Sequence, residues 1–235
     1  MKNIFTKIAL FLLVAVFLGT GCIASASADS TSDTSAEETS CFVKKNGRPV
    51  TSASELSMYD VVTFGNYAQT AMGSEKPIQW YVIGKEGNKV MLLSVYGLAH
   101  KKFHEKNEEV AFQGSDLFRL LNEEFKANAF TEEESAMLAA PVSLLSKSEA
   151  EQLPLMYRIT SATDYAIAQG ANPTRCLWWV GNFYMTKTFV DYYGCGWYEL
   201  SYASAAYCMN DAGEMSAYQV NFSGKVARPM IIIQF

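Results

Sequence analysis

The sequence predicts an α+β fold, and three observations along its 235 residues carry that prediction. Runs rich in β-branched and aromatic residues at 61–67 and 78–95 are typical of strands. Helix-capping signals dominate between residues 115 and 170, and short aromatic runs broken by glycine follow from Leu177 onward. Strands, then helices, then strands again are the order expected of an α+β protein.

The first predicted strands include a hairpin. Val61–Tyr67 (VVTFGNY) reaches a glycine turn, and Ile78–Ile83 (IQWYVI) alternates in hydropathy. The segment 85–88 (KEGN) is typical of a turn, so we expect Ile78–Ile83 to pair with Val90–Val95. The proline-started run Arg228–Ile233 predicts a buried or edge strand, and we expect the terminal strands to pair in one sheet.

The middle of the chain predicts helices with recognisable starts. Ser115 is a favourable N-cap, and Thr131 with Glu134 forms a capping box for a second helix. Further starts are expected at Ser148 and Ser161. The apolar residues that share one face of the first helix, expected to be buried near Trp80, are Leu117, Leu120, Leu121 and Phe125.

The N-terminal segment predicts an export signal. Lys2 and Lys7 give a short basic start, Ile8–Leu18 is an unbroken apolar run, and Ala26-Ser27-Ala28 is an A-x-A cleavage site. The apolar run is shorter than the roughly 20 residues that a membrane-spanning helix needs. We therefore interpret residues 1–28 as a signal peptide and expect the mature protein to be extracytoplasmic.

A second cleavage position competes with the first. Gly19-Thr20-Gly21-Cys22 is similar to a bacterial lipobox, whose cysteine is lipidated and becomes the new N-terminus, so the signal would then comprise residues 1–21. A diacylated Cys22 would anchor the protein to the cell membrane. Residues 29–50 begin with an acidic stretch rich in Ser and Thr and are expected to form a flexible tether. Residues 51–235 are then expected to form a single globular domain.

The charge balance disfavours nucleic acid as a partner. The chain has 19 Lys and Arg against 24 Asp and Glu, and removal of Lys2 and Lys7 with the signal leaves 17 against 24, a net charge of −7. Proteins that bind nucleic acid carry a basic face. We therefore expect no nucleic-acid partner, and contact with a membrane only through an N-terminal lipid.

The cysteines favour disulfide formation in an exported protein. The chain has five cysteines, of which four follow Cys22, and an even number is typical of a disulfide framework. We expect at least one bridge among Cys176, Cys195 and Cys208, with the pairing and the alternative of free buried thiols both left open. No C-x-x-C or metal-binding spacing is present, so we expect no metal and no cofactor.

Other candidate metal-binding and catalytic motifs in the sequence are weak. His100 and His104 stand four positions apart but lack the glutamate of an H-E-x-x-H motif and a third ligand, so a metal site is not expected. Asn210–Gly213 (NDAG) has oxygen ligands for calcium, but it is more typical of a hairpin turn. No G-x-S-x-G, P-loop or dinucleotide motif occurs, and we assign no catalytic residue.

Aromatic residues are unusually dense between Trp178 and Tyr207. Adjacent residues of a strand point to opposite faces, so pairs such as Tyr192 and Tyr193 cannot both be buried on one face. Exposed Trp and Tyr rings provide stacking surfaces for sugar rings and protein partners. The expected ligand-binding residues are Trp178, Trp179, Tyr192, Tyr193, Trp197 and Tyr198.

Several motifs occur in the order and at the spacing of one bacterial family. They are Val61–Tyr67, Pro77–Trp80, Gly114–Phe125, Thr163–Ala166 and Ala227–Pro229. On these motifs, residues 59–235 resemble the family catalogued as domain of unknown function 6273. One motif departs from the family, because Trp178-Trp179 is followed by Val180-Gly181-Asn182 instead of a Leu-Arg-Ser-Pro-Gly-like turn.

The tryptophan strand, the glycine-broken hairpins and the Arg-Pro end also look like the C-type-lectin-like fold. This resemblance implies a mixed or antiparallel sheet with helices on one side. Lectins, formylglycine-generating enzymes and the variable ligand-binding proteins of bacterial retroelements share the fold, so it constrains function only weakly.

The leading interpretation is an exported, surface-tethered domain that binds an extracellular glycan or protein and is not an enzyme. One alternative is an enzyme of the formylglycine-generating type that uses Cys195 and Cys208, which would require a reactive, accessible thiol. Another is a purely structural module of the cell envelope.

Mass spectrometry of the mature N-terminus distinguishes the two processing routes. Because the lipobox-like motif directly follows the apolar run, we expect the mature chain to begin at a lipid-modified Cys22. A mature chain that begins at Asp29 without lipid would exclude the lipoprotein and leave export intact.

Overall fold

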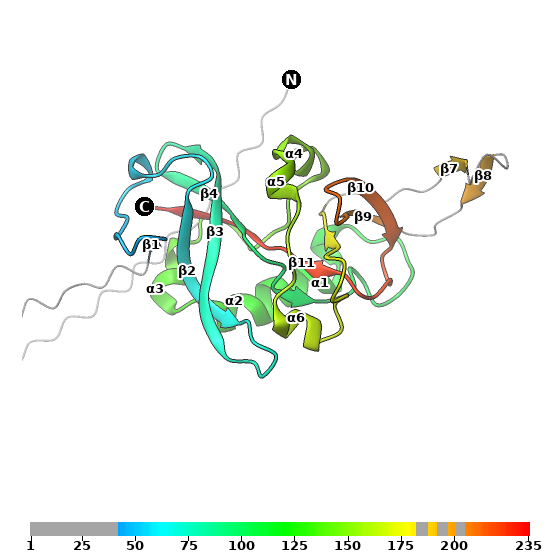
Figure 1. Ribbon diagram of the computed structural model, residues 1–235, viewed down its shortest axis with the longest axis horizontal. Coiled ribbons are helices and arrows are strands. Elements are labelled where there is room, and N and C mark those ends of the chain that lie inside the picture. The colour runs from blue at the N-terminus through cyan, green and yellow to red at the C-terminus, as the bar shows by residue number, and fades with distance from the viewer. Residues whose placement is uncertain (1–41, 182–187, 192–196, 201–204) are drawn as a thin grey trace, which may run out of the picture. The chain divides into compact units, whose positions relative to one another are not determined.

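The structure, a computed structural model, describes residues 42–181, 188–191, 197–200 and 205–235. This part of the chain contains two five-stranded sheets, a two-stranded ribbon and several short helices (Figure 1), which confirms the α+β class. The strand order is β1-β2-β3-β4-β12 in the first sheet and β10-β9-β6-β11-β5 in the second. Among the described strands, β6 and β11 pair in parallel and the other pairs are antiparallel.

The strands of the first sheet are β1 (Val43–Lys44), β2 (Val61–Ala68), β3 (Glu75–Glu86), β4 (Lys89–Ser94) and β12 (Met230–Gln234). Those of the second sheet are β5 (Ala99–His100), β6 (Trp178–Trp179), β9 (Ala205–Met209), β10 (Met215–Gln219) and β11 (Val226–Ala227). The ribbon is formed by β7 (Thr188–Asp191) and β8 (Trp197–Leu200).

The α-helices are α1 (Asp116–Arg119), α2 (Lys126–Ala129), α3 (Glu132–Met137), α4 (Lys147–Gln152), α5 (Leu155–Arg158) and α6 (Asp164–Ala168). A π-helical turn, η3 (Leu120–Phe125), joins α1 to α2, and the 3₁₀ turns are η1 (Ala53–Glu55) and η2 (Phe112–Gly114).

The predicted hairpin is confirmed in the first sheet. β3 and β4 pair antiparallel across a turn in which Gly87 has a φ of +60°, a conformation that favours glycine. Along β3, Ile78, Trp80 and Val82 are fully buried and alternate with half-buried residues. One face of this sheet therefore packs into the main core, as the alternation in the sequence predicts.

Gly65 of the VVTFGNY motif joins this sheet to the helical segment. It lies at an irregularity in the pairing of β2 with β3 and has a φ of +71°. A Cβ atom there would lie 2.6 Å from the carbonyl oxygen of Ala129 and 2.7 Å from the ring of Phe130. Its N–H donates to Oε1 of the buried Glu134 at 3.1 Å. Only glycine permits this close approach.

The helix predicted after Ser115 is confirmed. The Ser115 hydroxyl accepts a hydrogen bond from the Phe118 N–H at 3.1 Å. The helix continues through α1, η3 and α2, and its residues Leu117, Leu121 and Phe125 are fully buried, whereas Leu120 is partly buried. The Thr131–Glu134 capping box at the start of α3 is also confirmed.

Two helices begin at a different residue from the one predicted. The sequence SKSEAE contains two overlapping S-x-x-E motifs, and the capping box of α4 uses Ser146 and Glu149, two positions earlier than Ser148. Similarly, α6 is capped by Thr163 and not by Ser161. Ser146 and Thr163 accept hydrogen bonds from N–H groups in the first turn of their helices, as the predicted caps would have done two positions later or earlier.

The folded region begins earlier than the predicted boundary at residue 51. Phe42 and Val50 are buried in the main core, and β1 pairs with β2, so residues 42–50 belong to the fold and not to the tether. β1 and β12 occupy opposite edges of the first sheet, so the terminal strands share a sheet without pairing directly.

The chain crosses from the second sheet to the first at Arg228, between β11 and β12, along the red C-terminal segment in Figure 1. Arg228 is fully buried, and its guanidinium donates to the carbonyl oxygens of Ser94 at 2.8 Å and Tyr157 at 2.6 Å. It lies 5.1 Å from the ring centroid of Trp178. Burial lowers the pKa of Arg228 to about 10.

We expect Leu121→Ala to lower the free energy of unfolding by about 2–5 kcal/mol, because it removes apolar contacts and leaves a cavity in the core. Leu120→Ala is the matched control on the same helix and should cost less, since Leu120 is only partly buried. Denaturant unfolding measures both. A loss below about 1 kcal/mol for Leu121→Ala would contradict the assigned packing.

Candidate functional site

The two tryptophans of the predicted ligand-binding surface lie in the core. Trp178 and Trp179 form β6, which pairs with β11 on one side and β9 on the other, and both side chains are fully buried. They belong to two different core clusters, one on each face of the sheet. Neither ring is therefore exposed at the surface, where the aromatic density of the sequence predicts a ligand-binding face.

Cations of the protein itself contact these aromatic rings. The guanidinium of Arg228 packs on Trp178, and Lys225 Nζ lies 5.8 Å from the ring centroid of Trp179. The same ammonium lies 3.7 Å from the ring centroid of Tyr218 and 4.2 Å from that of Phe222. Burial lowers the pKa of Lys225. Part of the aromatic density therefore holds buried charges in place.

The other four predicted ligand-binding residues lie in or next to the β7–β8 ribbon, where no side chain is described. Tyr192 and Tyr193 are outside the described residues, and Trp197 and Tyr198 lie on β8, opposite Asp191 and Val190 of β7. Cys22 also lies outside the described residues. Their predicted roles stay predictions.

Cys176 and Cys208, the two described cysteines, form no disulfide with each other. Cys208 is buried and Cys176 is half-buried, and burial raises the pKa of Cys176 to about 12 and raises that of Cys208 as well. Such thiols are poor nucleophiles, because the thiolate is the reactive form. Cys195 lies outside the described residues, so a bridge from it to either partner stays a prediction.

The two histidines contact different segments. His104 Nδ1 lies 2.7 Å from a carboxylate oxygen of Asp116, and its Nε2 lies 3.2 Å from Glu108. His100 Nε2 instead accepts from the Gly224 N–H at 3.2 Å. Within the described residues, no group of three or more His, Cys, Asp or Glu is arranged to hold a metal ion.

The NDAG segment is a hairpin turn between β9 and β10, as predicted. The Asn210 side-chain oxygen accepts from the N–H groups of Ala212 and Glu214, both at 2.9 Å. Both carboxylate oxygens of Asp211 accept from the guanidinium of Arg175, at 2.9 and 3.0 Å. These oxygen atoms are therefore already engaged within the protein.

A polar cavity of about 370 Å³ lies where three segments of the chain meet. The β2–β3 hairpin contributes side chains to it, the link between β4 and β5 contributes Tyr96, and the start of α6 contributes Asp164. Its lining residues are Gln69, Lys76, Gln79, Tyr96, Ala162, Thr163 and Asp164. We call it the Tyr96 cavity.

The polar groups of the Tyr96 cavity are available to a ligand. Among the described residues, the side chains of Gln79, Tyr96 and Asp164 have no hydrogen-bond partner. Gln69 is held in place, because its amide N–H groups donate to the carbonyl oxygens of Lys76 at 2.8 Å and Pro77 at 3.1 Å. The Tyr96 side chain is 38% exposed, which leaves an aromatic surface at the cavity.

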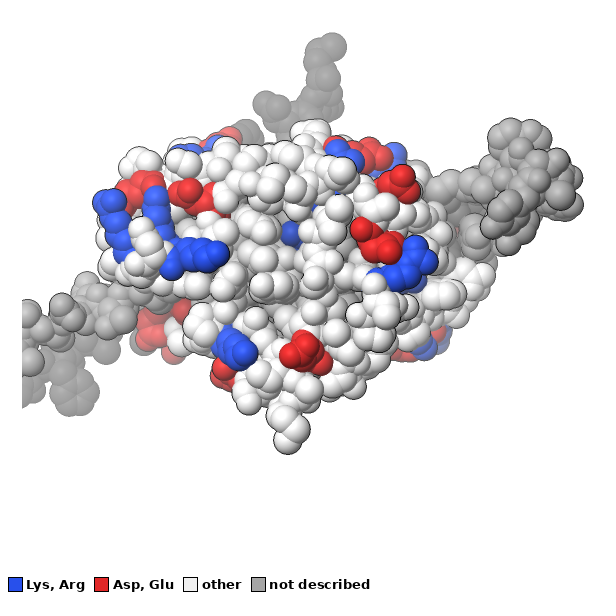
Figure 2. All heavy atoms as spheres, viewed as in Figure 1, with Lys and Arg blue, Asp and Glu red and all other residues white. Residues whose placement is uncertain are grey.

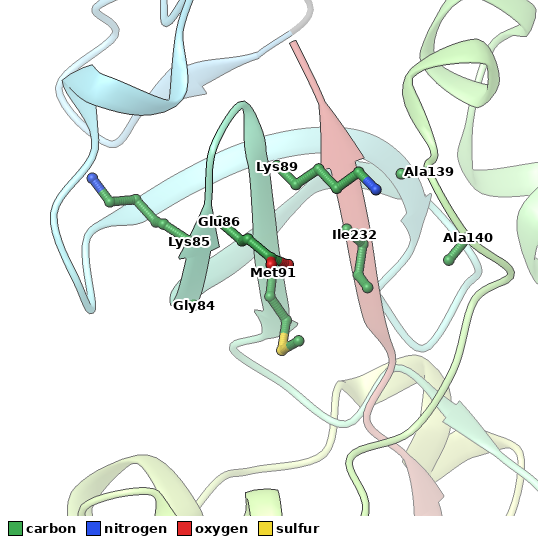
Figure 3. Close-up of a pocket in the computed structure, with 8 residues that line it drawn as sticks. All are labelled: Gly84, Lys85, Glu86, Lys89, Met91, Ala139, Ala140 and Ile232. Carbon is green, nitrogen blue, oxygen red and sulfur yellow. The ribbon is translucent and has the colours of Figure 1, made fainter.

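A second cavity, of about 410 Å³, lies over β3, β4 and β12 (Figure 3). Its lining residues are Gly84, Lys85, Glu86, Lys89, Met91, Ala139, Ala140 and Ile232, and we call it the Met91 cavity.

On the face drawn in Figure 2, charged side chains of both signs lie toward the margins and leave a broad, largely uncharged middle.

Neither cavity was identified from the sequence. The residues of the Tyr96 cavity span positions 69–164 and share no local motif, so only the fold brings them together. Gln79 and Asp164 lie in motifs that resemble the family, but the sequence does not show that β3 and α6 place them beside Tyr96.

No family model, curated protein or solved structure matches this chain. None of the helices in the described ranges is long and apolar enough to span a bilayer.

His100 should titrate below its ordinary pKa of 6.5, because burial disfavours the imidazolium. The fold then favours the neutral ring, so its stabilising contribution is present above pH 6.5 and is lost as the pH falls through 6.5 toward the folded-state pKa. NMR titration of the two imidazoles measures this directly.

In the same NMR titration, the His104→Gln variant retains only the His100 imidazole, so the remaining signal belongs to His100. Denaturant unfolding of His100→Gln at several pH values tests the effect on stability. We expect this variant to lose less free energy of unfolding than the wild type between neutral and mildly acidic pH. A His100 pKa at or above 6.5 in the folded protein would contradict the burial of its ring.

Proposed function

We propose that this chain is an exported, surface-tethered ligand-binding domain with a C-type-lectin-like fold, and that it binds carbohydrate in the Tyr96 cavity. The observation that carries the proposal is the convergence of unpartnered polar side chains beside an exposed aromatic ring. The export signal and the lipobox-like motif support the location outside the cytoplasm.

The chemistry of the cavity suits a sugar. A pyranose ring presents hydroxyl groups that both donate and accept hydrogen bonds, and an apolar C–H face. The Gln79 amide can donate and accept, the Asp164 carboxylate accepts and the Tyr96 ring can stack on the C–H face. An apolar pocket with a few polar groups is the usual site for hydrophobic ligands, so the polar lining here favours a hydroxylated one.

The arrangement of the strands supports the proposed fold. The tryptophan strand β6 lies inside a mixed sheet next to β11, and the chain then enters β12 through Arg228 and Pro229. The tryptophan strand and the Arg-Pro end are among the features on which the resemblance to the C-type-lectin-like fold rests.

A protein ligand is the second candidate, and α5 favours it. Leu155 is 55% exposed, Met156 is 71% exposed and Ile159, just after the helix, is 45% exposed. Apolar side chains that gather at the surface are typical of protein contacts. The enzyme alternative has less support, because Cys208 is buried and its raised pKa disfavours the thiolate.

Binding of the mature protein to a glycan array, followed by calorimetry with the best glycan, tests the proposal. We expect Tyr96→Ala and Gln79→Ala each to weaken binding by roughly threefold to tenfold, through loss of stacking or of a hydrogen bond. The melting temperature should change little, because Tyr96 is 38% exposed.

Met156→Ala is the matched control, since it removes an exposed side chain outside the cavity. Absence of any bound glycan, or full binding by both cavity variants, would contradict the carbohydrate proposal. A protein captured by the wild type and lost in Met156→Ala would support the second candidate instead.

A further inference from the structure

The Met91 cavity combines an apolar floor with sides that are lined by small residues. Met91 on β4 and Ile232 on β12 are half-buried and form the floor (Figure 3). Gly84, Ala139 and Ala140 line the sides. None of these residues belongs to the Tyr96 cavity.

The backbone conformation at Gly84 does not require glycine, so the space beside it results from the missing side chain. It lies where the pairing of β3 with β4 shifts register, between Val82 and Gly84. Its φ is not in the left-handed region, and an added Cβ would meet Met91 Cβ at 3.4 Å and Sδ at 3.8 Å, which are ordinary contacts. A side chain at this position is therefore sterically tolerable, and its absence helps to keep the cavity open.

Two opposite charges border the floor without pairing. Glu86 and Lys89 stand directly opposite each other across the β3–β4 hairpin, where such residues commonly form an ion pair. Among the described residues neither has an ion-pair partner. In Figure 3, Lys89 extends over β12 toward Ala139, and the Glu86 carboxylate lies beside Met91.

Lys85, the other cation of the lining, is already engaged. Its Nζ donates to the carbonyl oxygens of Ala53 and Leu56, and in Figure 3 its side chain points away from the cavity. Lys89 and Glu86 are therefore the charged groups that remain for a ligand.

We propose that the Met91 cavity binds a free aliphatic α-amino acid. The aliphatic side chain lies against Met91 and Ile232, the ammonium faces Glu86 and the carboxylate faces Lys89. A zwitterion pairs both charges at once, whereas a fatty acid would pair only with Lys89 and leave Glu86 unpaired, and an alkylamine would pair only with Glu86 and leave Lys89 unpaired. The flexible thioether of Met91 adapts to leucine, isoleucine or methionine.

Calorimetry of the full mature chain with L-leucine tests this proposal. We expect one leucine per chain. N-acetyl-leucine lacks the ammonium and leucinamide lacks the carboxylate, so each should bind roughly threefold to tenfold more weakly, as expected for partly exposed ion pairs. Octanoate that binds as well as leucine, or capped forms that bind equally well, would overturn the proposal.

Variants of the cavity test the assignment of the site. Gly84→Val should fill the space and weaken leucine binding by about tenfold or more, while Lys45→Gln, an exposed lysine outside the cavity, should bind normally. Tyr96→Ala should also bind leucine normally, which separates this site from the proposed sugar site. Circular dichroism reports whether each variant is folded.

If Gly84→Val does not fold, the exposed substitutions Glu86→Gln and Lys89→Gln decide, each with an expected loss of roughly threefold to tenfold. Absence of leucine binding by the wild type, or wild-type affinity in these folded variants, would overturn the proposal.

Discussion

The buried guanidinium of Arg228 is the interaction on which the arrangement of the two sheets depends. It lies where the chain leaves β11 for β12, and it bonds the carbonyl oxygens of Ser94 at the end of β4 and Tyr157 in α5 while it packs on Trp178 of β6. Burying a charge is costly unless it is hydrogen-bonded. One side chain therefore joins both sheets and a helix, and Lys could not replace its planar, multiply donating group.

This junction also positions the Tyr96 cavity. The Ser94 residue that accepts from Arg228 donates its hydroxyl to the carbonyl oxygen of Tyr96 at 2.8 Å, which fixes the backbone that carries the exposed ring. On the other side, the Tyr157 ring stacks on Tyr59 with centroids 4.2 Å apart. The segment that carries Tyr96 is thus held by core contacts, and a site held on a rigid support can bind a ligand with little loss of entropy.

The sequence correctly predicted the turns and helix starts that depend on interactions between neighbouring residues. The hairpin around Gly87, the Ser115 cap and the Thr131–Glu134 capping box follow from short-range signals, and each was confirmed. The predicted start of α4 at Ser148 was two positions late, because the overlapping motif at Ser146 and Glu149 supplies an equivalent capping box.

What the sequence could not predict depends on contacts between distant residues. Alternation predicts that adjacent strand residues face opposite ways, which holds for Trp178 and Trp179, but each face of β6 is covered by a separate core cluster.

The late position of β11 and β12 in the sequence has a consequence for how the chain folds. Ser94 and Arg228 are 134 positions apart, and pairings of such range form slowly. Until β11 and β12 emerge from the ribosome, β5 lacks its described partner and one edge of β4 is open to other strands. A chain that ends before Val226 therefore leaves both sheets unfinished at once.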